Sequence, residues 1–74
     1  MEIYRDIDND SNVRAYRIDI EGILVQFCDG KEYYYSNSSA GPDVIMKMKK
    51  KAVAGEGLNA YIVKVVKKRF EWKR

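Results

Sequence analysis

The sequence predicts an α+β fold, a three-stranded antiparallel β-meander packed against two C-terminal helices. Two patterns carry this expectation. Between residues 13 and 36, apolar and polar side chains alternate with the period of half-buried strands. After Pro42, apolar residues recur at helical spacing as far as Phe70. A chain of 74 residues supplies enough apolar surface for one small core, so we expect residues 1–74 to form a single domain.

The first ten residues are polar and precede the first predicted strand. Two outcomes stay open for them: they fray, or Ile3 and Ile7 pin them to the body of the domain. Residues 13–20 then alternate apolar with charged side chains, which predicts a strand. Glu21-Gly22 is typical of a turn and ends that strand.

Two further strands, over residues 23–28 and 31–36, are expected to form a hairpin whose turn length follows from parity. A two-residue loop would place Phe27 on the same face as Tyr34, whereas a three-residue loop closed by a left-handed Gly30 separates the faces cleanly. A slip of one residue would exchange the two faces, so the cleaner arrangement is favoured. The predicted inner face holds Ile23, Val25, Phe27, Tyr33 and Tyr35, and the outer face holds Leu24, Gln26, Glu32 and Tyr34.

Two helices are expected after a loop over residues 36–41. The first spans residues 42–53, where proline suits the first turn, and the glycines of residues 55–57 end it. The second spans residues 58–70; its β-branched residues would also suit a strand, but its lysines keep a helical spacing. The apolar stripes are Val44, Ile45, Met48 and Ala52 in the first helix, and Leu58, Ile62, Val65, Val66 and Phe70 in the second.

The net charge of +3 conceals a division between the two halves of the chain. Residues 1–43 carry nine acidic and four basic side chains, a net charge of −5, whereas residues 44–74 carry two acidic and ten basic ones, a net charge of +8. Two interpretations stay open. The basic half binds an anionic partner, or the two halves neutralise each other across the fold.

The residue types present exclude several classes of enzyme. The chain has no histidine, so Ser-His triads, histidine acid–base chemistry and histidine metal sites are excluded. Cys28 is the single cysteine, and no histidine can activate it, so we expect an inert thiol in or beside the hairpin turn. The sequence therefore predicts a protein that is not an enzyme and holds no cofactor.

Two weak motifs are not expected to bind a ligand. The alternating Asp6, Asp8 and Asp10 resemble the start of a calcium loop, but the glycine and the closing glutamate of such a loop are missing. Gly55 and Gly57 precede a predicted helix, where main-chain N–H groups can cradle a phosphate. No lysine follows at the distance a P-loop needs, so a turn between helices is the favoured interpretation.

The sequence predicts a cytoplasmic location. No apolar run approaches the roughly 18 residues that a membrane-spanning helix needs. The N-terminus is polar and acidic, unlike a secretory signal peptide. One cysteine cannot form an internal disulfide, which agrees with a reducing compartment.

An ordered series of motifs covers roughly residues 11–66: Ser11-Asn12-Val13, then Ile23, Val25, Phe27 and Gly30, then Tyr33 and Tyr35, and finally Gly55, Leu58, Asn59 and Ile62. In this series the chain resembles the KTSC domain family, which occurs at the C-terminus of some lysyl-tRNA synthetases and as small stand-alone bacterial proteins. The chain departs from the family at Leu58, usually an aromatic residue, and at Ile18, often a tyrosine. The resemblance implies the same fold, and RNA binding has been suggested for the family.

These observations predict a small binding module for RNA or another nucleic acid. Tyr34 is expected on the open face of the sheet near Tyr16 or Arg14, where a base can stack. Basic helix faces would supply phosphate contacts without sequence preference. The predicted site residues are Lys47, Lys50, Lys51, Lys64, Lys67, Lys68 and Arg69, together with Tyr34.

Other roles for the same residues stay open. The lysines can serve solubility alone, as charged helix faces commonly do, or they can bind an acidic protein partner. Phe70 and Trp72 near the C-terminus can anchor a partner or a second copy of the chain. No contact with a membrane is expected.

Overall fold

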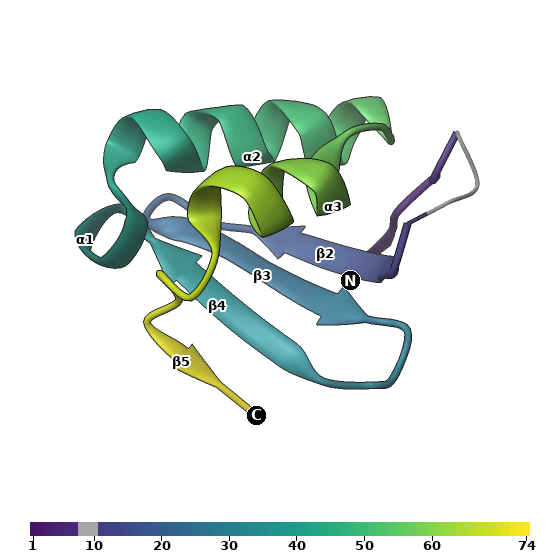
Figure 1. The fold of residues 1–74 in the computed structure, drawn as a ribbon, viewed down its shortest axis with the longest axis horizontal. Coiled ribbons are helices and arrows are strands. Elements are labelled where there is room, and N and C mark those ends of the chain that lie inside the picture. Colours follow the sequence, from purple (N-terminus) through teal and green to yellow (C-terminus); the bar gives the residue numbers. More distant parts are fainter. Residues whose placement is uncertain (8–10) are drawn as a thin grey trace.

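The computed structural model describes residues 1–7 and 11–74, which form one antiparallel sheet with helices over one face (Figure 1). The predicted α+β class is therefore confirmed. Along the chain the elements are β1 (Glu2–Ile3), β2 (Val13–Ile18), β3 (Gly22–Phe27), β4 (Glu32–Ser36), α1 (Asn37–Ala40), α2 (Pro42–Ala54), α3 (Leu58–Tyr61), the π-helix η1 (Ile62–Val66) and β5 (Trp72–Lys73). Strands neighbour one another in chain order, from β1 to β5.

The prediction of three strands is wrong, because the described residues form a five-stranded sheet. The additional strands, β1 and β5, have two residues each and pair with β2 and β4 at the two edges. The helices lie between β4 and β5 in the chain, so they are not the C-terminal elements (Figure 1). A two-residue strand is too short to show alternation, so only tertiary pairing identifies it.

The β3–β4 hairpin has the predicted register. The Phe27 N–H donates to the Lys31 carbonyl at 2.9 Å, and Gly30 closes the three-residue loop at φ +89°. That positive φ is accessible to glycine at little cost. The inner pairs of the hairpin are Ile23 with Tyr35 and Val25 with Tyr33.

The core lies between the inner face of the sheet and α2. This helix runs one residue further than predicted and ends at Gly55 in the left-handed conformation, with φ +78°. Its predicted stripe is confirmed, since Ile45, Met48 and Ala52 are buried and Val44 is partly buried against them. Burial of each large apolar side chain contributes about 1.5–3 kcal/mol to folding.

The N-terminal segment is attached by Tyr4. This tyrosine is buried in the core, and its hydroxyl accepts a hydrogen bond from the Leu58 N–H at 3.2 Å. Ile3 and Ile7, the anchors in one of the two open alternatives, are exposed, so they do not pin the segment to the body. β1 pairs with β2, and the residue that follows β1, Tyr4, lies in the core instead. For residues 8–10, the choice between the two alternatives lies outside the described part of the chain.

The predicted loop after β4 contains a single helical turn, α1. Ser36 caps it: the Ser36 hydroxyl accepts from the Ser39 N–H at 3.1 Å, and the Ser39 hydroxyl accepts from the Ser36 N–H at 3.0 Å. This reciprocal arrangement is a capping box, which stabilises even a very short helix. Small polar residues that indicated a loop therefore form a capped turn.

The second predicted helix is shorter than expected and is not regular. Its α-helical part spans only Leu58–Tyr61, and it continues as the π-helix η1, which ends at Val66 rather than Phe70. The Lys67 N–H bonds to the Ile62 carbonyl at 2.6 Å, five residues back. Successive β-branched side chains in this segment disfavour tight α-helical packing, and a helix widened in this way is often found at functional sites.

Within residues 1–7 and 11–74, no helix is both long enough and apolar enough to cross a membrane. The same residues contain no group of three or more acidic, cysteine or histidine side chains that could hold a metal ion. Two members of the weak aspartate motif, Asp8 and Asp10, lie outside the described residues. For Asp6, the carboxylate accepts a hydrogen bond from the Ser11 N–H at 3.2 Å.

Candidate functional site

A recess of about 560 Å³ opens on the helix-covered side of the sheet, between the β3–β4 turn and the C-terminal end of η1. We call it the aromatic recess. It is lined by Phe27, Tyr33, Tyr35 and Phe70, by Asn12, Asn59, Ile62 and Val63, and by Cys28, Asp29, Lys67, Lys68 and Lys73. Its volume lies within the range of small-ligand pockets in proteins.

Tyr33 is at the centre of the aromatic lining. Its ring meets Phe27 edge-on at 5.3 Å between centroids and Phe70 edge-on at 5.0 Å, and it stacks with Tyr35 at 6.5 Å. Edge-on aromatic pairs contribute about 0.5–1.5 kcal/mol beyond the area they bury. The hairpin register places two of these rings next to each other, and Phe70 reaches them from beyond η1.

Tyr35 carries a hydroxyl without a protein partner. The residue is only 2% exposed, yet within the described chain no group is hydrogen-bonded to its hydroxyl. Every fully buried side-chain polar atom of the described residues has a partner, so the Tyr35 oxygen must remain accessible from the recess that the residue lines. Burial, and secondarily the neighbouring Tyr33, raises the pKa of Tyr35 to about 12. The phenol therefore stays protonated at neutral pH and can donate a hydrogen bond to a ligand.

Lysines surround the opening of the recess. Lys67, Lys68 and Lys73 are exposed, and no carboxylate of the described residues pairs with their ammonium groups. The Lys73 ammonium lies 5.7 Å from the centre of the Phe70 ring. Among the described residues that line the recess, Asp29 is the one acidic residue, so their net charge is +2.

Lys67 has a backbone conformation that lysine rarely adopts, with φ +53° and ψ −123°. Such a conformation costs of order 1–3 kcal/mol for a non-glycine residue. It turns the chain out of η1 and back towards the sheet, so that Phe70 can contact Tyr33 and Tyr35. This turn forms one wall of the recess.

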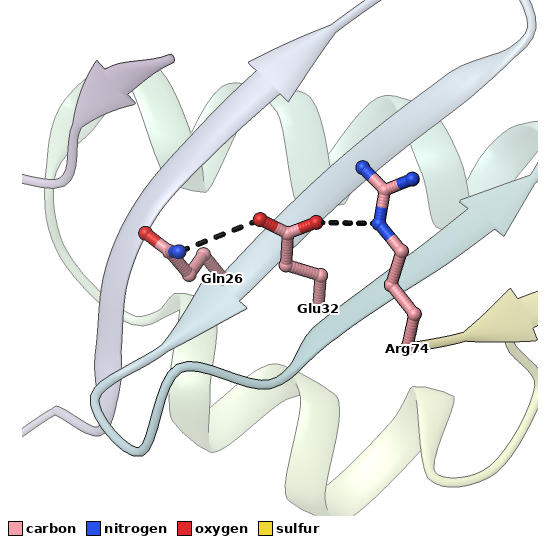
Figure 2. Close-up of polar contacts among 3 residues, drawn as sticks. All are labelled: Gln26, Glu32 and Arg74. Atoms are coloured by element: carbon pink, nitrogen blue, oxygen red, sulfur yellow. Dashed lines mark hydrogen bonds and ion pairs between the residues drawn. The ribbon is translucent and has the colours of Figure 1, made fainter.

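The wall is attached to the sheet through contacts on the opposite, helix-free face. The Trp72 ring stacks on Tyr34 at 5.4 Å with 22° between the planes. Figure 2 shows Glu32 between Gln26 and Arg74: the Arg74 Nε donates to one carboxylate oxygen at 2.8 Å, and Gln26 donates to the other at 3.4 Å. The C-terminal segment 71–74 therefore joins the two faces of the sheet.

Only two of the predicted site residues, Lys67 and Lys68, lie at the aromatic recess. Lys51 instead lies over the Tyr61 ring at 5.4 Å and lines a shallower hollow with Lys50. The remaining predicted cations are exposed and line neither hollow: Lys47, Lys64 and Arg69.

Tyr34 lies on the helix-free face, as predicted, but its neighbours differ from those expected. Tyr16 is buried on the inner face, opposite Val25, and Trp72 stacks on the Tyr34 ring instead. The Tyr34 hydroxyl donates to the Asp19 carboxylate at 3.0 Å. Desolvation and that hydrogen bond raise the pKa of Tyr34 to about 12. Tyr34 and the recess lysines lie on opposite sides of the sheet, so they do not form one surface.

Sequence reasoning counted Lys73 among the basic residues but missed that Lys73 and Phe70 meet in the recess. Both follow the turn at Lys67, so their positions depend on a conformation that the sequence pattern does not reveal. The signal that could have been used is the parity of the hairpin, which places Phe27, Tyr33 and Tyr35 side by side at the turn end of the sheet. Such a row of rings needs either a covering element or a ligand.

No protein-family model matches this chain, and no similar protein was found among curated proteins or among solved structures.

Proposed function

We propose that this chain is a non-enzymatic module that binds single-stranded nucleic acid, preferably RNA, and holds one base in the aromatic recess. The observation that carries the proposal is the combination, in one opening, of an aromatic lining with three lysines that pair with no carboxylate of the described residues. Bases stack on aromatic rings, and phosphates pair with ammonium groups, so a nucleotide matches both halves of this lining.

The expected energies fit a modest, salt-dependent interaction. Stacking of a base on an aromatic side chain contributes about 1–3 kcal/mol. Each lysine that neutralises a phosphate releases counterions. For single strands, the logarithm of the affinity falls by about 0.7 per contacted phosphate for each unit of log salt concentration. Lys47, Lys50 and Lys64 are exposed cations outside the recess and are further candidates for phosphate contacts.

Membership of the KTSC domain family belongs to the same proposal. It rests on the ordered motifs between residues 11 and 66 and on the α+β fold. Two motif residues of that series, Phe27 and Asn59, line the aromatic recess, and so do both tyrosines of the Tyr-x-Tyr motif. The motifs that suggest the family and the site that suggests nucleic-acid binding thus coincide in part.

A salt titration of binding to a short fluorescein-labelled single-stranded RNA, followed by anisotropy, tests the proposal. The wild-type chain should bind at low salt and lose affinity as salt rises. Changing Lys67, Lys68 and Lys73 together to glutamine should reduce the slope of log affinity against log salt by about 2. The matched control changes three exposed cations that do not line the recess, Arg14, Arg17 and Lys31, to glutamine. If the wild type shows no binding at low salt, the proposed function is wrong.

A further inference from the structure

Resting on the proposed function, we infer that the aromatic recess binds a nucleoside phosphomonoester, as found at a phosphorylated strand end, with the base inside and the phosphate at the lysines. Three features of the recess support this assignment: the unpartnered hydroxyl of Tyr35, the charge at the opening, and the size of the cavity.

The Tyr35 hydroxyl can donate a hydrogen bond to an acceptor that enters the recess. Tyr35 is 2% exposed, and no group of the described residues is hydrogen-bonded to its hydroxyl. The carbonyl and ring-nitrogen atoms of a nucleobase are such acceptors, and the flat face of the base suits the aromatic lining.

The charge at the opening matches a dianion better than a diester. Among the described lining residues, Lys67, Lys68 and Lys73 against Asp29 give a net charge of +2. The Asp29 carboxylate already accepts a hydrogen bond from the Lys31 N–H at 3.0 Å, within its own turn. A phosphomonoester carries about −1.5 to −2 charges at neutral pH and offers three acceptor oxygens, whereas an internal diester carries one charge.

The size of the recess limits how much of a strand can enter. A volume of about 560 Å³ lies within the range of sites for one small ligand, so it can hold one base. The lining differs with depth, since Tyr35 is buried and the three lysines are exposed. A base therefore points inward, and its phosphate stays at the opening in contact with solvent.

The test compares RNA strands of one sequence that differ only in their ends: a 5′-phosphate, a 3′-phosphate or hydroxyls at both ends. Either the 5′-phosphorylated or the 3′-phosphorylated strand should bind about tenfold more tightly than the hydroxyl strand. This ratio corresponds to about 1.4 kcal/mol in binding free energy. Free nucleoside monophosphates form a fourth arm and show whether the strand itself is needed. Equal binding of all three strands would overturn the inference and leave the proposed function standing. Absence of binding by every strand would instead overturn the proposed function.

Two variants separate the base from the phosphate. Tyr35→Phe removes only the hydroxyl, and it should weaken binding of all strands about equally; Tyr61→Phe, outside the recess, should not. Lys67→Gln with Lys73→Gln should abolish the preference for the phosphorylated end. If this preference survives the double substitution, the phosphate lies elsewhere and the assignment is wrong. Thermal unfolding of each variant shows that the fold is retained.

The single cysteine gives an independent readout. Cys28 is exposed and lines the recess, so iodoacetamide modifies one known position at its opening. A saturating phosphorylated strand should slow this alkylation several-fold. A strand that binds without protecting Cys28 would place the ligand outside the recess and contradict the inference.

Discussion

Lys67 combines a cost to folding with a contribution to the candidate site. Its φ of +53° and ψ of −123° suit glycine, and its ammonium group is one of the three around the aromatic recess. Lys67→Gly should therefore raise the free energy of unfolding by about 1 kcal/mol, at the lower end of the cost of such strain, while it weakens binding of nucleic acid. Urea unfolding and anisotropy measure the two effects.

The control for this substitution is Lys68→Gly. Lys68 also lines the recess but has no positive φ, so glycine there should lower binding without raising stability. If both substitutions change stability equally, glycine does not release strain at Lys67. The claim that Lys67 contributes to binding at a cost in stability is then wrong.

Tyr35 should make stability fall at alkaline pH. Its pKa is raised to about 12 in the folded chain, against an ordinary value near 10, because burial disfavours the phenolate. Between these two values the unfolded chain releases the proton and the folded chain keeps it. Stability from this group is therefore complete below about pH 10 and is lost as pH rises towards 12. Urea unfolding at pH 9 and 11 should show a smaller decrease for Tyr35→Phe than for the wild type; an identical decrease would contradict the raised pKa.

At the scale of the elements, the C-terminal segment 71–74 holds the wall of the recess from the other side of the sheet. The Trp72 ring stacks on Tyr34, and the Glu71 carboxylate accepts from the Ser36 hydroxyl at 2.7 Å. Trp72→Ala should lower stability by about 0.5–1.5 kcal/mol from the lost stacking alone. It should also weaken binding of nucleic acid, although Trp72 does not line the recess.

Trp72→Phe is the matched variant, because it keeps a ring over Tyr34. It should retain most of the stability and the affinity. If Trp72→Ala lowers stability but leaves affinity unchanged, the segment stabilises the sheet without positioning Phe70 and Lys73.

The elements also show what can be predicted from sequence. Parity alone predicts the β3–β4 register, because a slip would bring Tyr34 inward with Phe27. Periodicity alone predicts α2, because the glycine that ends this helix directly follows it in the sequence. By contrast, η1 and β5 depend on the positive φ of Lys67 and on pairing with β4 across a long chain separation. The sequence identifies the lysines of the recess as basic residues, but it does not predict that they line the same recess as Phe70.

At the scale of the whole molecule, the two edges of the sheet bear on the alternative of self-assembly. β1 and β5 have two residues each, and β5 carries Lys73. Short, charged edge strands oppose pairing between sheets of different molecules. The net charge of +3 acts in the same direction. We therefore expect a monomer in light scattering over a wide range of concentrations.

Removal of residues 71–74 tests this role of the C-terminal edge. The deletion uncovers β4, whose Glu32 N–H otherwise donates to the Arg74 carbonyl at 2.7 Å and whose Tyr34 carbonyl accepts from the Glu71 N–H at 2.6 Å. These unpaired groups form a template for another strand, so the shortened chain should associate as concentration rises. Trp72→Ala keeps the main-chain pairing and should remain monomeric. If instead the full chain is a dimer that Trp72→Ala dissociates, the tryptophan anchors a second copy of the chain. The segment then serves self-assembly, and not the covering of the β4 edge.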